Sequence, residues 1–293
     1  MGQHLNRAKT FFGTDTRGLL EGGRYALLHT KTMEFDDLRP YVPGDDDVRD
    51  IDWKATARSA TGEPLVKRMV SEKHHKILLV ADAGRNMNAL APGGELKRDV
   101  AANVIAAIGL ISVPRSDEIA LVLGDSRASG RLPHRRGETH IESLVERYYQ
   151  HTVSAPGRSD ICEQLRFVAS GYRHRMLLII VSDEPETDDR LAAILKDLTA
   201  RHDVLWVMVT DQPAVGSAPD EIDGFDVASG KFVLDGETLG PGVIEAYRVA
   251  EAARVAKLDT FMTECSVPYT RINSNGEIRD KLVGLTGEFR HVH

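Results

Sequence analysis

The stretch Ile77-Leu-Leu-Val-Ala-Asp82 consists of five apolar residues followed by one carboxylate. A short continuous apolar run of this kind is typical of a strand that is buried on both faces, as in parallel sheets. Two further runs repeat the pattern, at 175–181 and 203–209, and a carboxylate, Asp183, also follows the first of these. Three such strands in one chain indicate a central sheet with both faces covered.

Segments with helical spacing of apolar residues separate these strands. They lie at 96–113, 138–149, 160–169, 187–200, 242–265 and 278–285. Further strands are expected at 118–123, near 130–132 and at 268–272. Buried strands that alternate with helices predict an α/β fold with a doubly wound, mostly parallel sheet of the Rossmann type, with helices on both faces.

The N-terminal part of the chain follows a different pattern. It is polar and without a clear period up to residue 23, and its strand-like runs lie at 24–35 and 64–72. We therefore expect a β-containing N-terminal extension over residues 1–74, followed by the sheet domain over 75–293. A stretch rich in proline and glycine predicts a hairpin insertion in the sheet domain near 211–240.

Composition restricts the classes of function. The 293 residues include 37 basic and 44 acidic side chains, which gives a formal net charge of −7. Mild acidity argues against a broad nucleic-acid or membrane-surface footprint, and no apolar run reaches the roughly 20 residues that span a bilayer. The two cysteines, Cys162 and Cys265, have neither disulfide nor metal spacing. We expect a cytoplasmic protein with no nucleic-acid partner and no membrane insertion.

Two carboxylates stand directly behind predicted strands. Asp82 closes the first apolar run, and Asp183 follows the run at 175–181. Ligands of doubly wound sheets bind in the crevice beyond the carboxyl ends of the strands. If the two strands are central neighbours, both carboxylates lie at one crevice. The alternative is that they only cap the helices and loops that follow the strands.

The stretch Asp82-Ala-Gly-Arg-Asn-Met87 resembles the end of the first strand in the von Willebrand factor A fold, where the metal-ion-dependent adhesion site reads Asp-x-Ser-x-Ser. This chain keeps Asp82 but has Gly84 and Asn86 in place of the serines. The resemblance implies a Mg²⁺ held by oxygen atoms, with an open position for a partner's carboxylate. A degenerate site that binds little or no metal and a real Mg²⁺ site both remain open. The implied ligands are Asp82, Asn86, Ser159, Asp160 and Asp183.

A second motif, between residues 39 and 58, combines acidic, basic and aromatic side chains. Asp52 fits the start of a short helix, where its carboxylate meets free N–H groups, and the arginines can fork onto carboxylates. Two compatible interpretations are a structural ion-pair cluster and a partner-docking surface. The residues concerned are Arg39, Tyr41, Gly44, Asp45, Asp46, Arg49, Asp52, Trp53 and Arg58.

This motif resembles the signature of the bacterial domain-of-unknown-function-58 (DUF58) family. The matching pieces are Glu34-Phe35, Arg39-Pro40-Tyr41, Gly44-Asp45, Ile51-Asp52-Trp53 and Ala57-Arg58. The resemblance implies a von Willebrand A-like fold and a partner of the MoxR type, which is an AAA+ ATPase. The chain departs from the family pattern in its loop, which is one residue longer and carries three consecutive aspartates at 45–47.

The expected function is that of a non-enzymatic protein-interaction module. By resemblance it acts with a MoxR-type AAA+ ATPase in protein maturation or chaperone-like assembly, on a client protein that the sequence does not identify. One alternative is a metal-dependent hydrolase that uses the strand-end aspartates, although no nucleophile or general base stands beside them. The other alternative is a scaffold with a vestigial metal site.

Overall fold

The computed structural model describes most of the chain, as two compact units. The described residues are 3–12, 33–42, 46–59, 63–71, 75–154, 156–213, 224–225, 227, 232–233 and 240–292. The smaller unit is Thr30–His74, and the larger unit combines Met1–His29 with His75–His293. We expected one N-terminal extension over 1–74, whereas Gln3–Phe12, the described part of its beginning, groups with the sheet domain.

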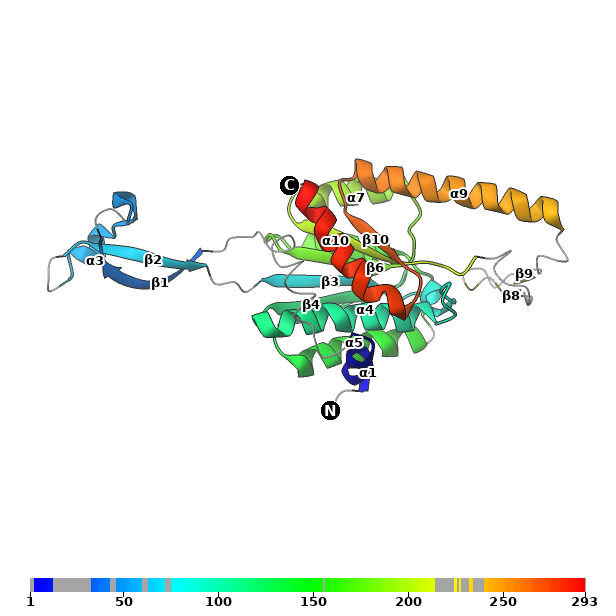
Figure 1. Ribbon diagram of the computed structural model, residues 1–293, viewed down its shortest axis with the longest axis horizontal. Helices are drawn as coiled ribbons and strands as arrows, with labels where there is room; N and C mark the ends of the chain where they lie inside the picture. Colours follow the sequence, from blue (N-terminus) through cyan, green and yellow to red (C-terminus); the bar gives the residue numbers. More distant parts are fainter. Residues whose placement is uncertain are drawn as a thin grey trace. The chain divides into compact units, whose positions relative to one another are not determined.

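The larger unit is built on a six-stranded sheet with the strand order β10-β7-β6-β3-β4-β5 (Figure 1). Its strands are β3 (Lys76–Asp82), β4 (Glu118–Gly124), β5 (Ser129–Arg135), β6 (Leu177–Ser182), β7 (Asp203–Val209) and β10 (Tyr269–Ile272). All neighbouring strands are parallel except β5, which pairs antiparallel with β4 at one edge. The expected doubly wound, mostly parallel α/β sheet is therefore confirmed.

Helices cover both faces of this sheet. They are α1 (Gln3–Phe12), α4 (Lys97–Ser112), α5 (Glu138–Val153), α6 (Ile161–Gly171), α7 (Asp189–Thr199), α9 (Pro241–Glu264) and α10 (Ile278–Val292), with short 3₁₀ turns η2 (Arg85–Asn88), η3 (Val113–Arg115) and η4 (Asn275–Glu277). Residues of α1, α4, α5 and α10 form the core on one face, and residues of α6, α7 and α9 form the core on the other (Figure 1).

Strand β3 contributes side chains to both hydrophobic cores. Ile77 and Leu79 belong to the first core, and Leu78 and Val80 belong to the second, because successive residues of a strand point to opposite faces of the sheet. All four side chains are buried. The continuous apolar run that predicted a strand buried on both faces thus lies at the centre of the sheet, between β4 and β6.

Helix α1 lies in a stretch where the sequence shows no clear period. Its side chains Leu5 and Ala8 are buried in the first core. A residue far along the chain caps the N-terminus of this helix. The Glu142 carboxylate accepts hydrogen bonds from the amides of His4 (3.1 Å) and Leu5 (2.9 Å). Such an acceptor usually stands just before the helix. A cap supplied by α5 explains why no local start signal is visible.

The smaller unit contains a two-stranded antiparallel sheet and two short helical turns. Its elements are β1 (Met33–Pro40), η1 (Val48–Asp50), α3 (Trp53–Thr56) and β2 (Leu65–Ser71). We expected the first strand at 24–35, but the observed strand continues to Pro40, and residues 24–32 lie outside the described part. A proline is tolerated there because each strand of a two-stranded sheet is an edge strand.

The predicted hairpin near 211–240 is described only in part. Strands β8 (Gly224–Phe225) and β9 (Phe232–Val233) pair antiparallel, while residues 214–223, 226, 228–231 and 234–239 lie outside the described part. Within the described residues, no helix combines the length and the apolar character that crossing a membrane requires.

Candidate functional site

The carboxyl ends of three adjacent parallel strands, β3, β6 and β7, meet at one edge of the sheet. Asp82 ends β3, Asp183 directly follows β6, and Asp211 follows β7. A cavity of about 380 Å³ opens at this edge. We call it the strand-end crevice, and its lining includes all five predicted site residues, Asp82, Asn86, Ser159, Asp160 and Asp183. The structure therefore brings them together.

Asp82 lies at the inner wall of the crevice and is only 2% exposed. Its carboxylate accepts from the Gly84 amide (2.8 Å) and is hydrogen-bonded by the Ser159 side chain. Both hydrogen bonds favour the charged form, but burial outweighs them and raises the pKa of Asp82 to about 7. At neutral pH a substantial fraction of this carboxyl group is protonated.

Gly84 allows the loop that carries Ser159 to approach the end of β3. A Cβ on residue 84 would lie 2.5 Å from Ser159 Cα and 2.6 Å from Ser159 Oγ, distances that real Cβ atoms do not show. The Ser159 hydroxyl also accepts from the Asn86 amide (3.2 Å). The Ser159 loop thus occupies the space that a serine side chain at position 84 would need.

Restoring the adhesion motif with Gly84→Ser is expected to lower the free energy of unfolding by about 1–3 kcal/mol, because the new side chain overpacks against Ser159. We also expect no heat of Mg²⁺ binding in calorimetry. Urea unfolding checks the first expectation. Gly171→Ser is the matched control, since a Cβ at that position meets no atom within 4 Å. Unchanged stability together with new Mg²⁺ binding would contradict this picture.

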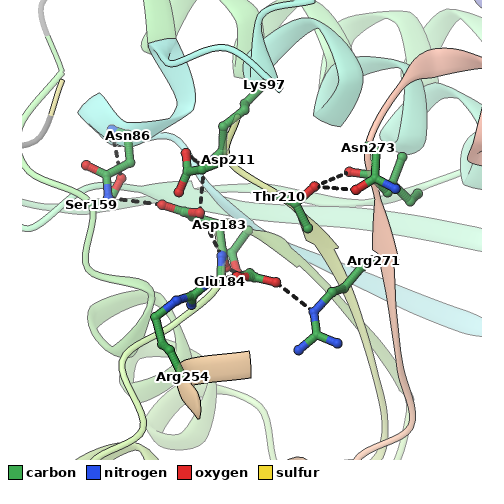
Figure 2. Close-up of polar contacts among 12 residues, drawn as sticks. Asn86, Lys97, Ser159, Asp183, Glu184, Thr210, Asp211, Arg254, Arg271 and Asn273 are labelled. Atoms are coloured by element: carbon green, nitrogen blue, oxygen red, sulfur yellow. Dashed lines mark hydrogen bonds and ion pairs between the residues drawn. The ribbon is translucent and has the colours of Figure 1, made fainter. Parts of the chain in front are cut away.

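Lys97, in the first turn of α4, reaches into the carboxylates behind the strands (Figure 2). Its side chain is fully buried, and Nζ donates to Asp183 Oδ1 (2.5 Å) and Asp211 Oδ1 (2.6 Å). Burial alone would lower the pKa of the Lys97 ammonium, but the two carboxylates outweigh it and the net shift is upward. The carboxylates of Asp183 and Asp211 therefore share a buried counter-cation within the protein.

Other candidate metal ligands also accept hydrogen bonds from groups of the protein itself. Asp183 accepts from Asn86 Nδ2 (3.0 Å) and from the Glu184 amide (2.7 Å), so Asn86 presents its NH₂ group to Asp183. Asp160 accepts from Arg190 Nη2 (3.1 Å). The candidate ligands Asp82, Ser159, Asp160 and Asp183 thus accept hydrogen bonds within the protein.

This donor set does not fit a Mg²⁺ site. Mg²⁺ requires near-octahedral coordination by oxygen atoms at about 2.0–2.1 Å, whereas Asp183 binds an ammonium and two amide groups, and Asp160 binds a guanidinium. Residue 84 offers no side-chain oxygen. In the described part of the chain, no group of three or more His, Cys, Asp and Glu side chains is placed to hold a metal ion.

Lys97 and Asp211 did not emerge from the sequence. Asp211 follows a buried strand, as Asp82 and Asp183 do, so the same rule would have found it. Lys97 carries a different signal, because a cation in the first turn of a helix faces the positive end of the helix dipole. Its presence there requires carboxylate partners, and the structure supplies Asp183 and Asp211.

The signature motif in the smaller unit contains a forked ion pair and a helix cap. Arg39 donates through Nη1 and Nη2 to the two carboxylate oxygens of Asp46 (2.9 and 2.5 Å). A hydrogen bond from the Val42 amide and the contact with Arg39 hold the pKa of Asp46 below its usual value. Asp52 accepts from two amides of α3 (3.0 and 3.1 Å), so the prediction that it starts a short helix is confirmed.

The remaining signature residues are mostly on the surface of this unit. Trp53 is 63% exposed, Arg49 and Arg58 are exposed, and Tyr41 is half-buried. Gly44 and Asp45 lie outside the described residues. The motif thus combines an internal ion pair with an exposed tryptophan, and the structural and docking interpretations remain compatible.

Sequence relatives of the chain are found in mycobacteria. The "Uncharacterized protein Rv1480" of Mycobacterium tuberculosis and the "Uncharacterized protein Mb1516" of Mycobacterium bovis are each 27% identical over 261 residues. Each match covers 88% of this chain and 80% of the relative.

Two solved structures match part of the chain at low similarity. An aerotolerance-related membrane protein from Bacteroides fragilis matches with a TM-score of 0.47 and 11% identity, over 73% of this chain and 99% of that chain. A von Willebrand factor type A protein from Catenulispora acidiphila matches with a TM-score of 0.43 and 10% identity, over 77% of this chain and 44% of that chain.

One family model matches more than half of the chain. It is described as "Protein of unknown function DUF58" and covers residues 37–219. This range includes most of the signature motif, the strand-end carboxylates Asp82, Asp183 and Asp211, and Lys97. The chain therefore belongs to the DUF58 family.

Proposed function

We propose that this protein is a non-enzymatic protein-interaction module of the cytoplasm, which acts with a MoxR-type AAA+ ATPase in protein maturation or chaperone-like assembly. The strand-end crevice carries the proposal. It lies where doubly wound sheets bind their ligands. Its five predicted residues come from the end of β3, the turn η2, the segment before α6 and the position after β6. The DUF58 signature is the reason for choosing this class of ATPase.

The walls of the crevice favour recognition over catalysis. Asp183 pairs with Lys97, and Glu184 accepts from Arg271 Nε (2.6 Å) and from Arg254 (Figure 2). A hydrolase would need an activated water or a nucleophile, and the donor set does not fit the metal that would activate water. Side chains that are already held in place reduce the entropy cost of binding a partner.

Blocking the crevice tests the proposal. Ser126 is exposed and lines the crevice, so Ser126→Trp fills its mouth without removing any contact of Asp82 or Lys97. We expect this variant to capture at least about tenfold less of the MoxR-type ATPase from the same organism, since bulky groups at the centre of an interface have large effects. His174→Trp is the matched control, on the exposed connection between α6 and β6.

Three results would contradict the proposal. The first is that wild-type protein captures no ATPase, and the second is that Ser126→Trp captures as much as the control. The third is turnover of a phosphoester that is lost in both Asp82→Asn and Asp183→Asn, which would favour the hydrolase alternative.

A further inference from the structure

A second cavity, of about 580 Å³, adjoins the strand-end crevice. We call it the arginine pocket, and its lining residues are Arg85, Ser126, Arg127, Pro156, Gly157 and Arg158. Ser126 and Arg158 line both cavities, so the two lie next to each other. The volume lies within the range of about 300–1,000 Å³ that is usual for ligand pockets, and arginines make up half of the lining residues.

The loops that carry these arginines are tied together. The Arg85 amide donates to the Gly157 carbonyl (2.8 Å), and the Ser126 amide donates to the Arg158 carbonyl (2.8 Å). The buried carboxylate of Asp125 accepts from the Gly157 amide (2.6 Å). The pocket is therefore held in shape by the chain itself.

Two of the three guanidinium groups are available to a ligand. Arg127 Nη2 pairs with Asp125 (3.0 Å). Burial opposes the ionisation of Asp125, but hydrogen bonds from Arg127 and Gly157 outweigh it and hold its pKa below the usual range. Arg85 and Arg158 are exposed, and within the residues that the structure describes neither of them pairs with a carboxylate. The pocket thus carries uncompensated positive charge.

We propose that the arginine pocket binds a carboxylate-bearing segment of a partner protein directly, without a divalent cation. The proposal rests on the proposed function, because it names the chemistry of the partner's docking segment. Guanidinium groups match carboxylates in a bidentate geometry. Because Lys97 already neutralises Asp183 in the adjoining crevice, no metal is needed there for an acidic segment to approach.

A phosphate ligand is less well matched to this pocket. Phosphate sites commonly use a concave set of backbone N–H groups. Here the amides of Arg85, Ser126 and Gly157 already donate to acceptors within the chain. The arginine side chains are therefore the main donors of the pocket, which favours an acidic protein segment.

The test uses fluorescence anisotropy with a labelled hexaglutamate peptide on the full chain, in EDTA and in Mg²⁺. We expect equal affinity in both buffers, and weaker binding as salt is added. The double variant Arg85→Glu with Arg158→Glu is expected to bind about tenfold to a hundredfold more weakly. Arg173→Glu, an exposed arginine between α6 and β6, is the matched control and is expected to bind as wild type does.

The proposal is overturned if the folded double variant binds the peptide as tightly as wild type does, or if EDTA abolishes binding. It is also overturned if inorganic phosphate or ATP binds more tightly than the peptide through the same arginines. Peptide binding without ATPase capture would refute the proposed function and leave this inference standing. If the double variant still captured the ATPase fully and still bound the peptide, this inference would be refuted and the proposed function would stand.

Discussion

Replacing Lys97 by methionine is expected to lower the free energy of unfolding by about 3–5 kcal/mol, the cost of breaking a buried ion pair from one side. The ammonium is fully buried and lies 2.5 Å from Asp183 and 2.6 Å from Asp211. Asp183 is itself nearly buried, so the variant leaves a carboxylate without its counter-charge where little water can solvate it. Urea unfolding at neutral pH measures the effect.

Two further variants test whether the uncompensated charge on Asp183 causes this loss of stability. Adding Asp183→Asn to Lys97→Met removes the uncompensated charge and is expected to recover part of the lost stability, which shows as a non-additive double-mutant cycle. Lys196→Met, at an exposed position of α7, should change stability by no more than about 0.5 kcal/mol. If Lys97→Met proved as mild as Lys196→Met, Lys97 would not be the cation that the strand-end carboxylates depend on.

The second large effect is the pH dependence of stability that Asp82 is expected to cause. Its folded-state pKa of about 7 lies above the ordinary value of 3.8, so between these limits the folded state holds a proton that the unfolded state releases. This group therefore favours folding at low pH, and stability falls as pH rises through the window by up to about 1.4 kcal/mol per pH unit. The loss is complete about one pH unit above the folded-state pKa, near pH 8, and amounts to something on the order of 4 kcal/mol in all.

Asp82→Asn should remove this proton linkage while it keeps an acceptor oxygen for the Gly84 amide. The measurement is the free energy of unfolding of variant and wild type from about pH 4.5 to about pH 9. The variant's stability relative to wild type is expected to rise steadily with pH and to level off near pH 8. Glu245→Gln, on an exposed part of α9, should show no such trend. A difference between Asp82→Asn and wild type that does not change with pH would mean that Asp82 ionises at its ordinary pKa.

Much of the fold could be predicted because its signals are local. The strands at 77–81, 175–181 and 203–209 are apolar and short, and the structure has β3, β6 and β7 at these places. Helix α1 was missed because its cap, Glu142, comes from α5. The predicted end of the first strand of the smaller unit was wrong, because the charged run Glu34 to Arg39 has no alternation that marks a strand.

The candidate site was predicted in position but not in its internal contacts. Asp82 and Asp183 were expected at one crevice if their strands were neighbours, and β3 and β6 do pair. The sequence also allowed a Mg²⁺ ion between them. Only the folded chain shows that Lys97 and Asn86 donate hydrogen bonds to Asp183, and that Arg190 donates one to Asp160. These contacts join residues that are 30 to 97 positions apart. Sequence patterns relate residues within a few positions of each other, so they do not predict such contacts.

The sequence by itself determined the alternating strands and helices, the strand-end aspartates and the signature of the smaller unit, because each depends on residues close together in the chain. The tertiary structure alone decided which charges meet. It paired the Lys97 ammonium with Asp183, a candidate ligand of a divalent cation, placed Ser159 against Gly84, and gathered Arg85, Arg127 and Arg158 around one pocket. Hydrophobic periodicity is a local property, whereas charge pairing depends on distances that exist only once the sheet has formed.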